Sequence, residues 1–174
     1  MSSVQDARGN EQIRFSAHGR TWLIVLRGRW GAAIDRFLVR WTGFSMVTWQ
    51  YAMATGRRYT PTLLLTTIGA RSGRLRSTPL PYYPVGDGLV VCGSKGGGPT
   101  NPMWVANVRA NPQCWLRIRR QLVPARARVA EGVERDELFE TVAQVHLGLR
   151  RYQQQAATHG RQVPLVVLTP MTGS

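Results

Sequence analysis

The chain has 174 residues, 43% of them hydrophobic, which is enough for one globular domain with a real core and excludes a disordered tail. Its formal net charge is +14, so we expect an acidic partner: nucleic acid, an anionic membrane or a polyanionic small molecule. Of the 23 Lys and Arg residues only Lys95 is a lysine, which singles out its position.

The N-terminal residues 1–56 are predicted to form a helical segment. Its apolar face consists of Trp30, Ile34, Phe37, Leu38 and Trp41, with arginines off that face. The uncharged run at 41–56 is too short and too polar to span a bilayer. We favour packing of this face on the rest of the domain. The alternative is that residues 21–54 lie in the interface of an anionic membrane.

The remainder, residues 57–174, reads as a domain rich in strands. Strands are expected at 62–68, 76–85, 89–93, 114–119, 122–130 and 163–168, the last ended by Pro170. One helix is expected from Pro102, capped by Asn101, and a second after Glu131 with the core face Leu138, Val142, Val145 and Leu149. Tight turns between strands predict an α+β fold: an antiparallel β-barrel of about six strands, the N-terminal helical segment and two further helices.

Two turns are candidates for an anion-binding cradle. One carries Arg71, Arg74 and Arg76, and the other carries Ser94, Lys95 and the glycines Gly96, Gly97 and Gly98. Arginine binds phosphate or carboxylate through two hydrogen bonds, and glycine lets backbone N–H groups approach closely. A flexible hairpin turn with solvated arginines is an equally good interpretation. The turn with Lys95 is not a P-loop, because its lysine precedes the glycines.

The helix after the second turn would add a wall to this cradle. Asn107 is placed to hydrogen-bond the ring of a ligand, while Met103 and Trp104 would supply apolar contacts. Taken individually, Met103 and Trp104 are more simply explained by core packing. No nucleophile–base pair stands out, so chemistry at this site would have to come from a cofactor.

The cysteines and histidines are scattered, and no cluster has metal-ligand spacing, so we expect no metal site. Cys92 lies in an apolar run and is expected to be a buried, reduced thiol. The first residues lack an apolar signal sequence, so the expected location is cytoplasmic, with peripheral contact to the inner face of the plasma membrane as an option.

Three stretches together resemble one family: L-L-L-T-T-I-G-A-R-S-G-R-L-R-S-T-P-L, V-V-C-G-S-K-G-G-G-P-T-N-P-M-W-V-A-N-V-R-A-N-P and V-P-L-V-V-L-T-P. Over roughly residues 60–170 the chain is similar to the deazaflavin (coenzyme F420)-dependent nitroreductase and quinone reductase family of actinobacteria. The resemblance implies a split β-barrel related to flavin reductases. It also implies a cofactor with a phosphodiester and an oligoglutamate tail; the alternative cofactor is FMN.

By position, the resemblance implies that Arg71 and Arg76 contact the phosphate and tail. Arg74 would substitute for a second basic residue that the family often has where this chain has Ala70. The residues implied to line the cofactor pocket are Pro79, Ser94, Lys95, Gly96, Gly97, Met103, Trp104 and Asn107. Family members with nitroreductase activity place tyrosines three apart in the last helix. Here those positions are Leu149, Tyr152 and Gln155, so only Tyr152 matches.

The resulting hypothesis is an oxidoreductase that uses reduced F420 to transfer hydride to an electron-poor acceptor: a quinone, an activated C=C bond or a nitro compound. Ser94 or Tyr152 would donate a hydrogen bond or proton to the developing anion. One alternative is an ene-reductase of the same family in a natural-product pathway. Another is a non-catalytic basic protein that binds membrane or nucleic acid, although no nucleic-acid-binding motif is present and nucleic acid is not an expected partner.

Overall fold

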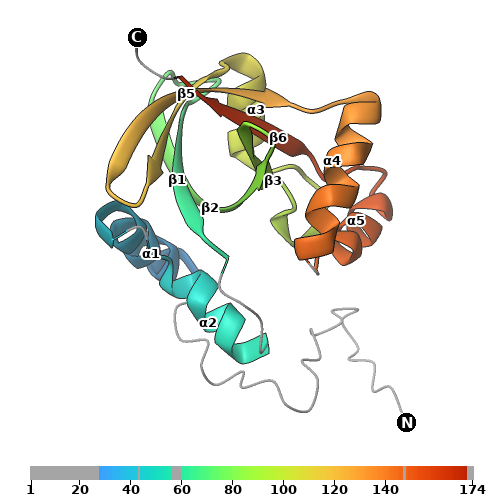
Figure 1. Ribbon diagram of the computed structural model, residues 1–174, viewed down its shortest axis with the longest axis horizontal. Helices are drawn as coiled ribbons and strands as arrows, with labels where there is room; N and C mark the ends of the chain where they lie inside the picture. The colour runs from blue at the N-terminus through green and yellow to red at the C-terminus, as the bar shows by residue number, and fades with distance from the viewer. Residues whose placement is uncertain (1–27, 43, 56–59, 147, 172–174) are drawn as a thin grey trace.

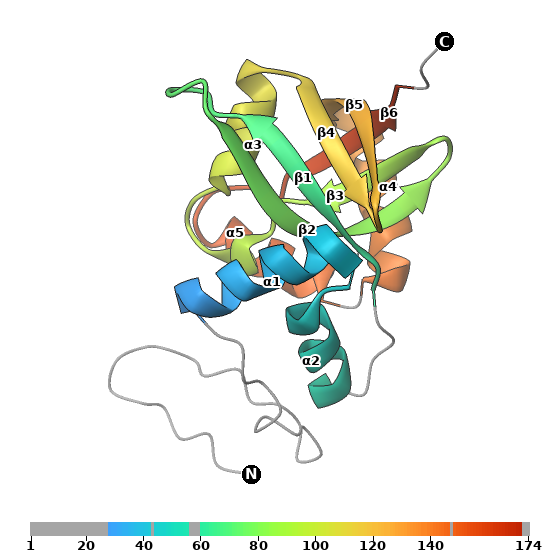
Figure 2. The same ribbon diagram turned by 90° about the vertical axis from the view of Figure 1, so that its left-hand side faces the viewer.

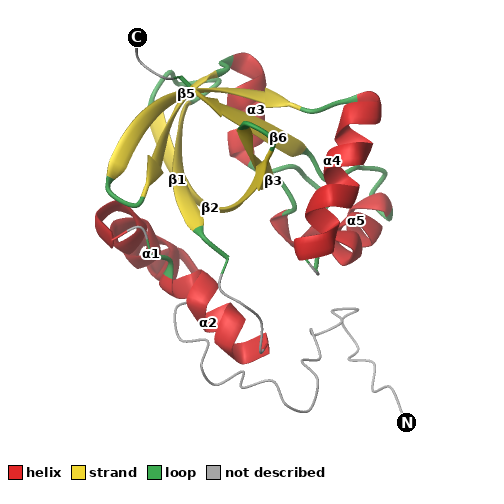
Figure 3. Cartoon of the chain, in the orientation of Figure 1, coloured by secondary structure: helices red, strands yellow, loops and turns green. Residues whose placement is uncertain are grey.

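The computed structural model describes residues 28–42, 44–55, 60–146 and 148–171. Six antiparallel strands close into a barrel in the order β1-β2-β3-β6-β5-β4 (Figures 1 and 3). The strands are β1 Thr62–Ile68, β2 Leu75–Val85, β3 Gly88–Cys92, β4 Gln113–Ile118, β5 Gln121–Val129 and β6 Leu165–Pro170. The helices are α1 Gly28–Thr42, α2 Met46–Thr55, α3 Met103–Ala110, α4 Gly132–Val145 and α5 Leu149–Ala157, with a 3-10 turn, η2, at Lys95–Gly97.

The barrel interior forms the main core. Alternation along the strands directs one set of side chains inward, including Leu63 and Leu65 of β1 and Leu116 of β4. Helix α3 adds Trp104 and Val105 to the same cluster. The core therefore links α3 rigidly to the strands on either side of it.

A second core lies on the outside of the barrel. Tyr83 and Val90, from β2 and β3, pack there with Phe139 and Val142 of α4 and Leu149 of α5. Figure 1 shows α4 and α5 together on this side, away from α1 and α2. The two helices α4 and α5 therefore form one layer against the barrel wall.

These observations confirm the expected fold class, with differences in its last third. The single helix expected after Glu131 is two helices, because α4 ends at Val145 and α5 begins at Leu149. Val145 was predicted to face the core, but 67% of its surface is exposed. The last strand begins later than expected and contains Pro170 instead of ending before it.

The N-terminal helices are held by a different face of α1 from the predicted one. Helix α1 packs against β1 and β2, and among its residues 33–42, whose side chains the structure describes, Val39 and Asp35 are buried. Ile34, Phe37 and Trp41 are exposed instead, Phe37 by 63% and Trp41 by 60%. The favoured prediction that this aromatic face packs on the domain is therefore wrong for these three residues. The side chain of Trp30, and all of residues 21–27, lie outside the described part of the chain.

Helix α2 continues from α1 and extends away from the barrel in both views (Figures 1 and 2). No helix among the described residues is both long and apolar enough to cross a bilayer. The division of the chain into residues 1–56 and 57–174 stays a prediction.

Asp35 fixes the corner between α1 and α2. Its carboxylate accepts a hydrogen bond from Ser45 Oγ, 2.9 Å from Oδ2, and one from the backbone N–H of Val47 at 3.0 Å. Val47 lies in the first turn of α2, where backbone N–H groups have no partner within the helix. Asp35 therefore caps α2 from a neighbouring helix.

We expect Asp35→Ala to loosen α2 while leaving the barrel intact. The substitution removes this acceptor from the buried hydroxyl of Ser45 and the partly buried N–H of Val47, and losing the partner of a buried group costs about 1–3 kcal/mol. Hydrogen–deuterium exchange should show faster exchange in peptides from residues 44–55 and unchanged exchange in β1 to β6. Asp87→Ala, at an exposed acid in the β2–β3 turn, is the control. Equal protection of α2 in both variants would contradict this account.

Candidate functional site

The turn after β3 has an unusual backbone. Lys95, Gly96 and Gly97 have φ angles of 46°, 65° and 79°, all in the left-handed region. Glycine adopts this conformation freely, whereas for Lys95 it costs roughly 1–2 kcal/mol. Two backbone hydrogen bonds close the turn, from Gly97 N to Ser94 O at 2.9 Å and from Gly98 N to Lys95 O at 3.2 Å. A strained lysine at this place points to a functional requirement.

The ammonium group of Lys95 is exposed at the mouth of this turn. Nζ donates to Thr100 Oγ1 at 2.7 Å, which uses one of its three N–H donors. The backbone therefore presents a fixed cation next to two glycines, an arrangement suited to an anionic or electron-rich ligand.

Arg161 holds the loop that contains this turn, and the sequence analysis did not identify it. Its Nε donates to Gly98 O at 2.6 Å, Nη1 to Asn101 Oδ1 at 2.9 Å and Nη2 to Ser94 O at 2.7 Å. Partial burial lowers the pKa of Arg161, but arginine remains charged at neutral pH. Asn101 was expected to cap α3, but Pro102 occupies the N-cap position and the Asn101 side chain accepts from Arg161.

Helix α5 lies directly against the same turn. A Cβ atom added to Gly97 would fall 2.5 Å from Gln155 Cβ and 3.0 Å from the carbonyl oxygen of Tyr152. Only glycine fits at this distance. The contact brings Tyr152, a predicted site residue more than fifty positions away in the sequence, next to Lys95 and Gly96.

Helix α3 connects this turn to the arginine-bearing turn between β1 and β2. Asn107 is buried; its Oδ1 accepts from Ala70 N at 3.0 Å and its Nδ2 donates to Thr67 Oγ1 at 3.1 Å. Its amide thus holds the β1–β2 turn against α3, and contact with a ligand stays a prediction. Helix α3, about 12 Å long, thus follows the lysine-bearing turn in the chain and binds the arginine-bearing turn through its fifth residue.

The first two residues of α3 differ in their surroundings. Trp104 is buried in the barrel core, as the simpler interpretation expected. Met103 is 69% exposed and so does not pack in the core, which leaves it free to contact a ligand. Pro79 is half-buried on β2, opposite Leu64 of β1.

Three exposed arginines, Arg71 and Arg74 of the β1–β2 turn and Arg76 at the start of β2, form no ion pair with an acid of the described residues. The ion pairs among the described residues are Arg128–Glu134, Arg135–Asp136 and Arg150–Glu140, and none involves Arg71, Arg74 or Arg76. The turn itself is ordered by hydrogen bonds from Gly69 N to Arg74 O and from Gly73 N to Gly69 O, at 2.9 and 2.8 Å. These three guanidinium groups can therefore bind an external anion without breaking an ion pair.

The candidate proton donors have different environments. Ser94 is half-buried, and its hydroxyl makes no capping hydrogen bond in the turn that it begins. The ring of Tyr152 meets the edge of His146 with centroids 5.9 Å apart, and His146 stacks on Tyr83 at 5.6 Å. Cys92 is a free cysteine, as predicted, but it is partly buried and not fully buried; its burial raises the pKa of the thiol to about 12, so it is protonated at neutral pH. No group of metal-ligating side chains occurs among the described residues.

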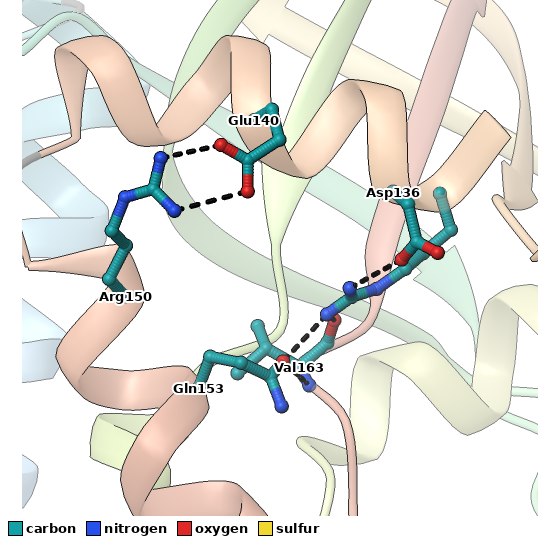
Figure 4. Close-up of polar contacts among 6 residues, drawn as sticks. Asp136, Glu140, Arg150, Gln153 and Val163 are labelled. Carbon is teal, nitrogen blue, oxygen red and sulfur yellow. Dashed lines mark hydrogen bonds and ion pairs between the residues drawn. The ribbon is translucent and has the colours of Figure 1, made fainter. Parts of the chain in front are cut away.

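A pocket of about 410 Å³ is lined in part by Arg161. Its lining includes Arg109 and Arg135 together with the first residues of α4, and Arg135 is held by Asp136 and Gln153 (Figure 4). None of the predicted site residues lines it. We therefore assign the candidate site to the turn at Lys95–Gly97, α3 and the β1–β2 turn, and not to this pocket.

Comparison with known proteins identifies the family. The sequence model described as F420H(2)-dependent quinone reductase matches residues 45–170. The chain belongs to this family. It is therefore an oxidoreductase that uses reduced coenzyme F420, and the alternative cofactor FMN has no support from the family.

Individual relatives agree with this assignment. The F420H(2)-dependent quinone reductase Rv1261c of Mycobacterium tuberculosis is 32% identical over 111 residues, which are 63% of this chain and 73% of the relative. The putative F420H(2)-dependent quinone reductase Rv3178 of the same organism is 30% identical over 66% of this chain and 93% of its own length. A solved structure of an F420-H2 dependent reductase, FDR-A, is 31% identical and superposes with a TM-score of 0.55 over 62% of this chain and 93% of its own.

The two adjacent glycines of the turn give a matched test of the contact with α5. Both have positive φ, but an added Cβ has no neighbour within 4 Å at Gly96, whereas at Gly97 it would overlap α5. Gly96→Ala should lower stability by about 1 kcal/mol through backbone strain alone. Gly97→Ala should cost at least about 2–3 kcal/mol because α5 must also move. Urea denaturation of both variants measures the difference. Equal destabilisation would show that the contact with α5 does not constrain the turn.

Proposed function

We propose that the protein transfers a hydride from reduced F420 to an electron-poor acceptor, and that a quinone is the first acceptor class to test. The observation that carries this proposal is the strained turn at Lys95–Gly97. Hydrogen bonds from Arg161 hold this turn, and it packs against the helix that bears Tyr152. Relatives named as F420H(2)-dependent quinone reductases support the choice of acceptor. An activated C=C bond and a nitro group are also electron-poor groups that accept hydride, and they remain alternatives.

The residues of the site fit a long cofactor with a polar ring system and an anionic tail. Lys95 would hold the head, and Met103 would cover one side of it. Arg71, Arg74 and Arg76 would hold the tail, because their guanidinium groups are exposed and have no acidic partner among the described residues. Helix α3 lies between these two groups, so an extended ligand can contact both.

When bound, reduced F420 supplies the hydride, and the chain's own residues stabilise the acceptor. An acceptor carbonyl or nitro group gains negative charge on oxygen as it is reduced. Ser94 is the donor nearest in sequence to Lys95, and its hydroxyl is not used for capping. Tyr152 is brought to the same turn by α5. Either hydroxyl can donate a hydrogen bond or proton to that oxygen, while the nearby Lys95 stabilises its charge.

Cofactor binding can be tested by fluorescence titration with F420 and, in parallel, with FMN. We expect micromolar or tighter binding of F420 and much weaker binding of FMN. Lys95→Ala and Arg76→Ala should each weaken F420 binding about 10-fold or more, since each removes a charge-assisted contact. Arg126→Ala, at an exposed arginine of β5, should change the affinity less than twofold. Absence of F420 binding, or equal effects of all three substitutions, would overturn the proposed site.

We also propose that α1 and α2 contact an anionic membrane surface. Ile34, Phe37 and Trp41 of α1 are exposed, as are Trp49 and Met53 of α2. The charged side chains exposed beside them, Arg36 and Arg40, are basic, and the acid of this segment, Asp35, is buried. Aromatic and aliphatic side chains next to arginines suit the headgroup region of a bilayer that carries negative lipids. Such contact would place the enzyme beside acceptors dissolved in the lipid.

Liposome flotation of the full chain tests the membrane proposal. The protein should float with vesicles that contain an anionic lipid and should float less with neutral vesicles or at high salt. The double substitution Phe37→Ser and Trp41→Ser should lower the bound fraction at least about fivefold, because each removes a large apolar side chain from the interface. Val133→Ser with Val145→Ser, two exposed apolar residues of α4, is the matched control. Equal flotation of both double variants would reject contact through α1.

A further inference from the structure

Tyr152 packs, partly buried, against the core between the barrel and the helices α4 and α5, and two of its contacts bear on the site. Its carbonyl oxygen lies against Gly97 of the cofactor turn, and its ring meets His146 edge-on with an interplanar angle of 71°. The backbone contact fixes where α5 passes the turn. The contact between the rings limits the rotation of the Tyr152 side chain that carries the hydroxyl.

His146 is itself held by a rigid part of the fold. It occupies the C-cap position of α4, and its backbone N–H donates to Val142 O at 2.7 Å. Its ring stacks on Tyr83 with an interplanar angle of 14°. Tyr83 is a buried residue of β2 and belongs to the core between the barrel and the helices α4 and α5. The imidazole is therefore fixed to the barrel wall.

The arrangement of α4 and α5 also depends on polar contacts away from these rings. Arg150 of α5 binds both carboxylate oxygens of Glu140 of α4, with Nη1 3.0 Å from Oε1. Arg135 of α4 donates to Gln153 of α5 at 2.6 Å. Figure 4 shows Arg150 facing Glu140, and Gln153 in a separate contact closer to Val163. Because these contacts hold the helices together, loss of the His146 ring should free the Tyr152 ring without separating α4 from α5.

From this geometry we infer that His146 is a positioning residue for the reaction: its ring, backed by Tyr83, holds the Tyr152 hydroxyl in the orientation that serves the acceptor. The inference rests on the proposed role of Tyr152 as a hydrogen-bond or proton donor. His146 acts through Tyr152, by the contact between the two rings. Aromatic pairs of this kind contribute roughly 0.5–1.5 kcal/mol beyond burial, enough to select one ring orientation. A donor displaced by about 1 Å loses most of its effect on rate.

The first test follows the Tyr152 ring directly by ¹⁹F NMR of the full chain labelled with 3-fluorotyrosine. The Tyr152 signal is assigned by its loss in Tyr152→Phe. His146→Ala should broaden or split this signal, whereas His146→Phe should keep it single and narrow because the ring is retained. His159→Ala, at an exposed histidine after α5, is the control and should change nothing. A single narrow Tyr152 signal in His146→Ala would overturn the inference.

The second test uses turnover with reduced F420 and a water-soluble quinone. His146→Ala should lower kcat about 10-fold while F420 affinity stays within twofold, and His146→Phe should restore most of the loss. In a Tyr152→Phe background, where the hydroxyl is absent, His146→Ala should lower kcat less than twofold. A loss of equal size in both backgrounds would mean that His146 has a general structural role, which overturns the inference.

The two tests also separate this inference from the proposed role of Tyr152. If Tyr152→Phe alone leaves kcat unchanged, Tyr152 is not the donor, and the inferred part of His146 in the reaction is overturned with it. The NMR signal then still shows whether His146 orients the ring. If Tyr152→Phe lowers kcat and the NMR signal is insensitive to His146→Ala, the donor role stands and only the positioning role of His146 is lost.

Discussion

The candidate site depends on one packing constraint: the left-handed turn at Lys95–Gly97 must lie close enough to α5 that position 97 has no room for a Cβ atom. Arg161 makes this arrangement stable, because its three nitrogen positions satisfy two backbone carbonyls and the Asn101 side chain around the turn. The entropy cost of ordering the loop is therefore already contained in the free energy of folding. A ligand that binds here does not have to order the loop, which favours tight binding and a fixed geometry for reaction.

Features determined by short stretches of sequence were predictable, and those determined by distant contacts were not. Strand β1 matches its expected range because seven residues between Pro61 and Gly69 carry a clear strand pattern, and the glycine turn has a local signature. The role of Arg161 depends on partners 60 to 67 positions away, and nothing in the sequence separates it from the other arginines. The break between α4 and α5 was missed because Leu149 continues the helical spacing of Leu138 and Val142 although it belongs to another helix.

Helix α1 shows a limit of hydrophobic periodicity. The pattern identifies residues that share a face of a helix, but it does not say what covers that face. Here the larger apolar side chains face outward, and α1 is attached through Val39 and the Asp35 cap of α2. A buried carboxylate among aromatic residues looks unfavourable in the sequence, because its partners, Ser45 and Val47, become visible only in the structure. The described residues therefore leave the aromatic face of α1 exposed, and a membrane surface or another partner can contact it.

The cofactor and acceptor sides of the site are built differently. The proposed cofactor side uses two turns and one short helix, so its residues lie close together in the sequence. On the acceptor side, three positions of α5 that the family resemblance groups together have separate surroundings. Leu149 is fully buried in the core, and Gln155 lies against Gly97, so a change at either position disturbs the core or the cofactor turn. Tyr152 and Gln155 both contact the turn and are not buried, but of the two only Tyr152 carries a hydroxyl that can donate a proton, so acceptor preference in this protein should depend on Tyr152 and on the rings that hold it.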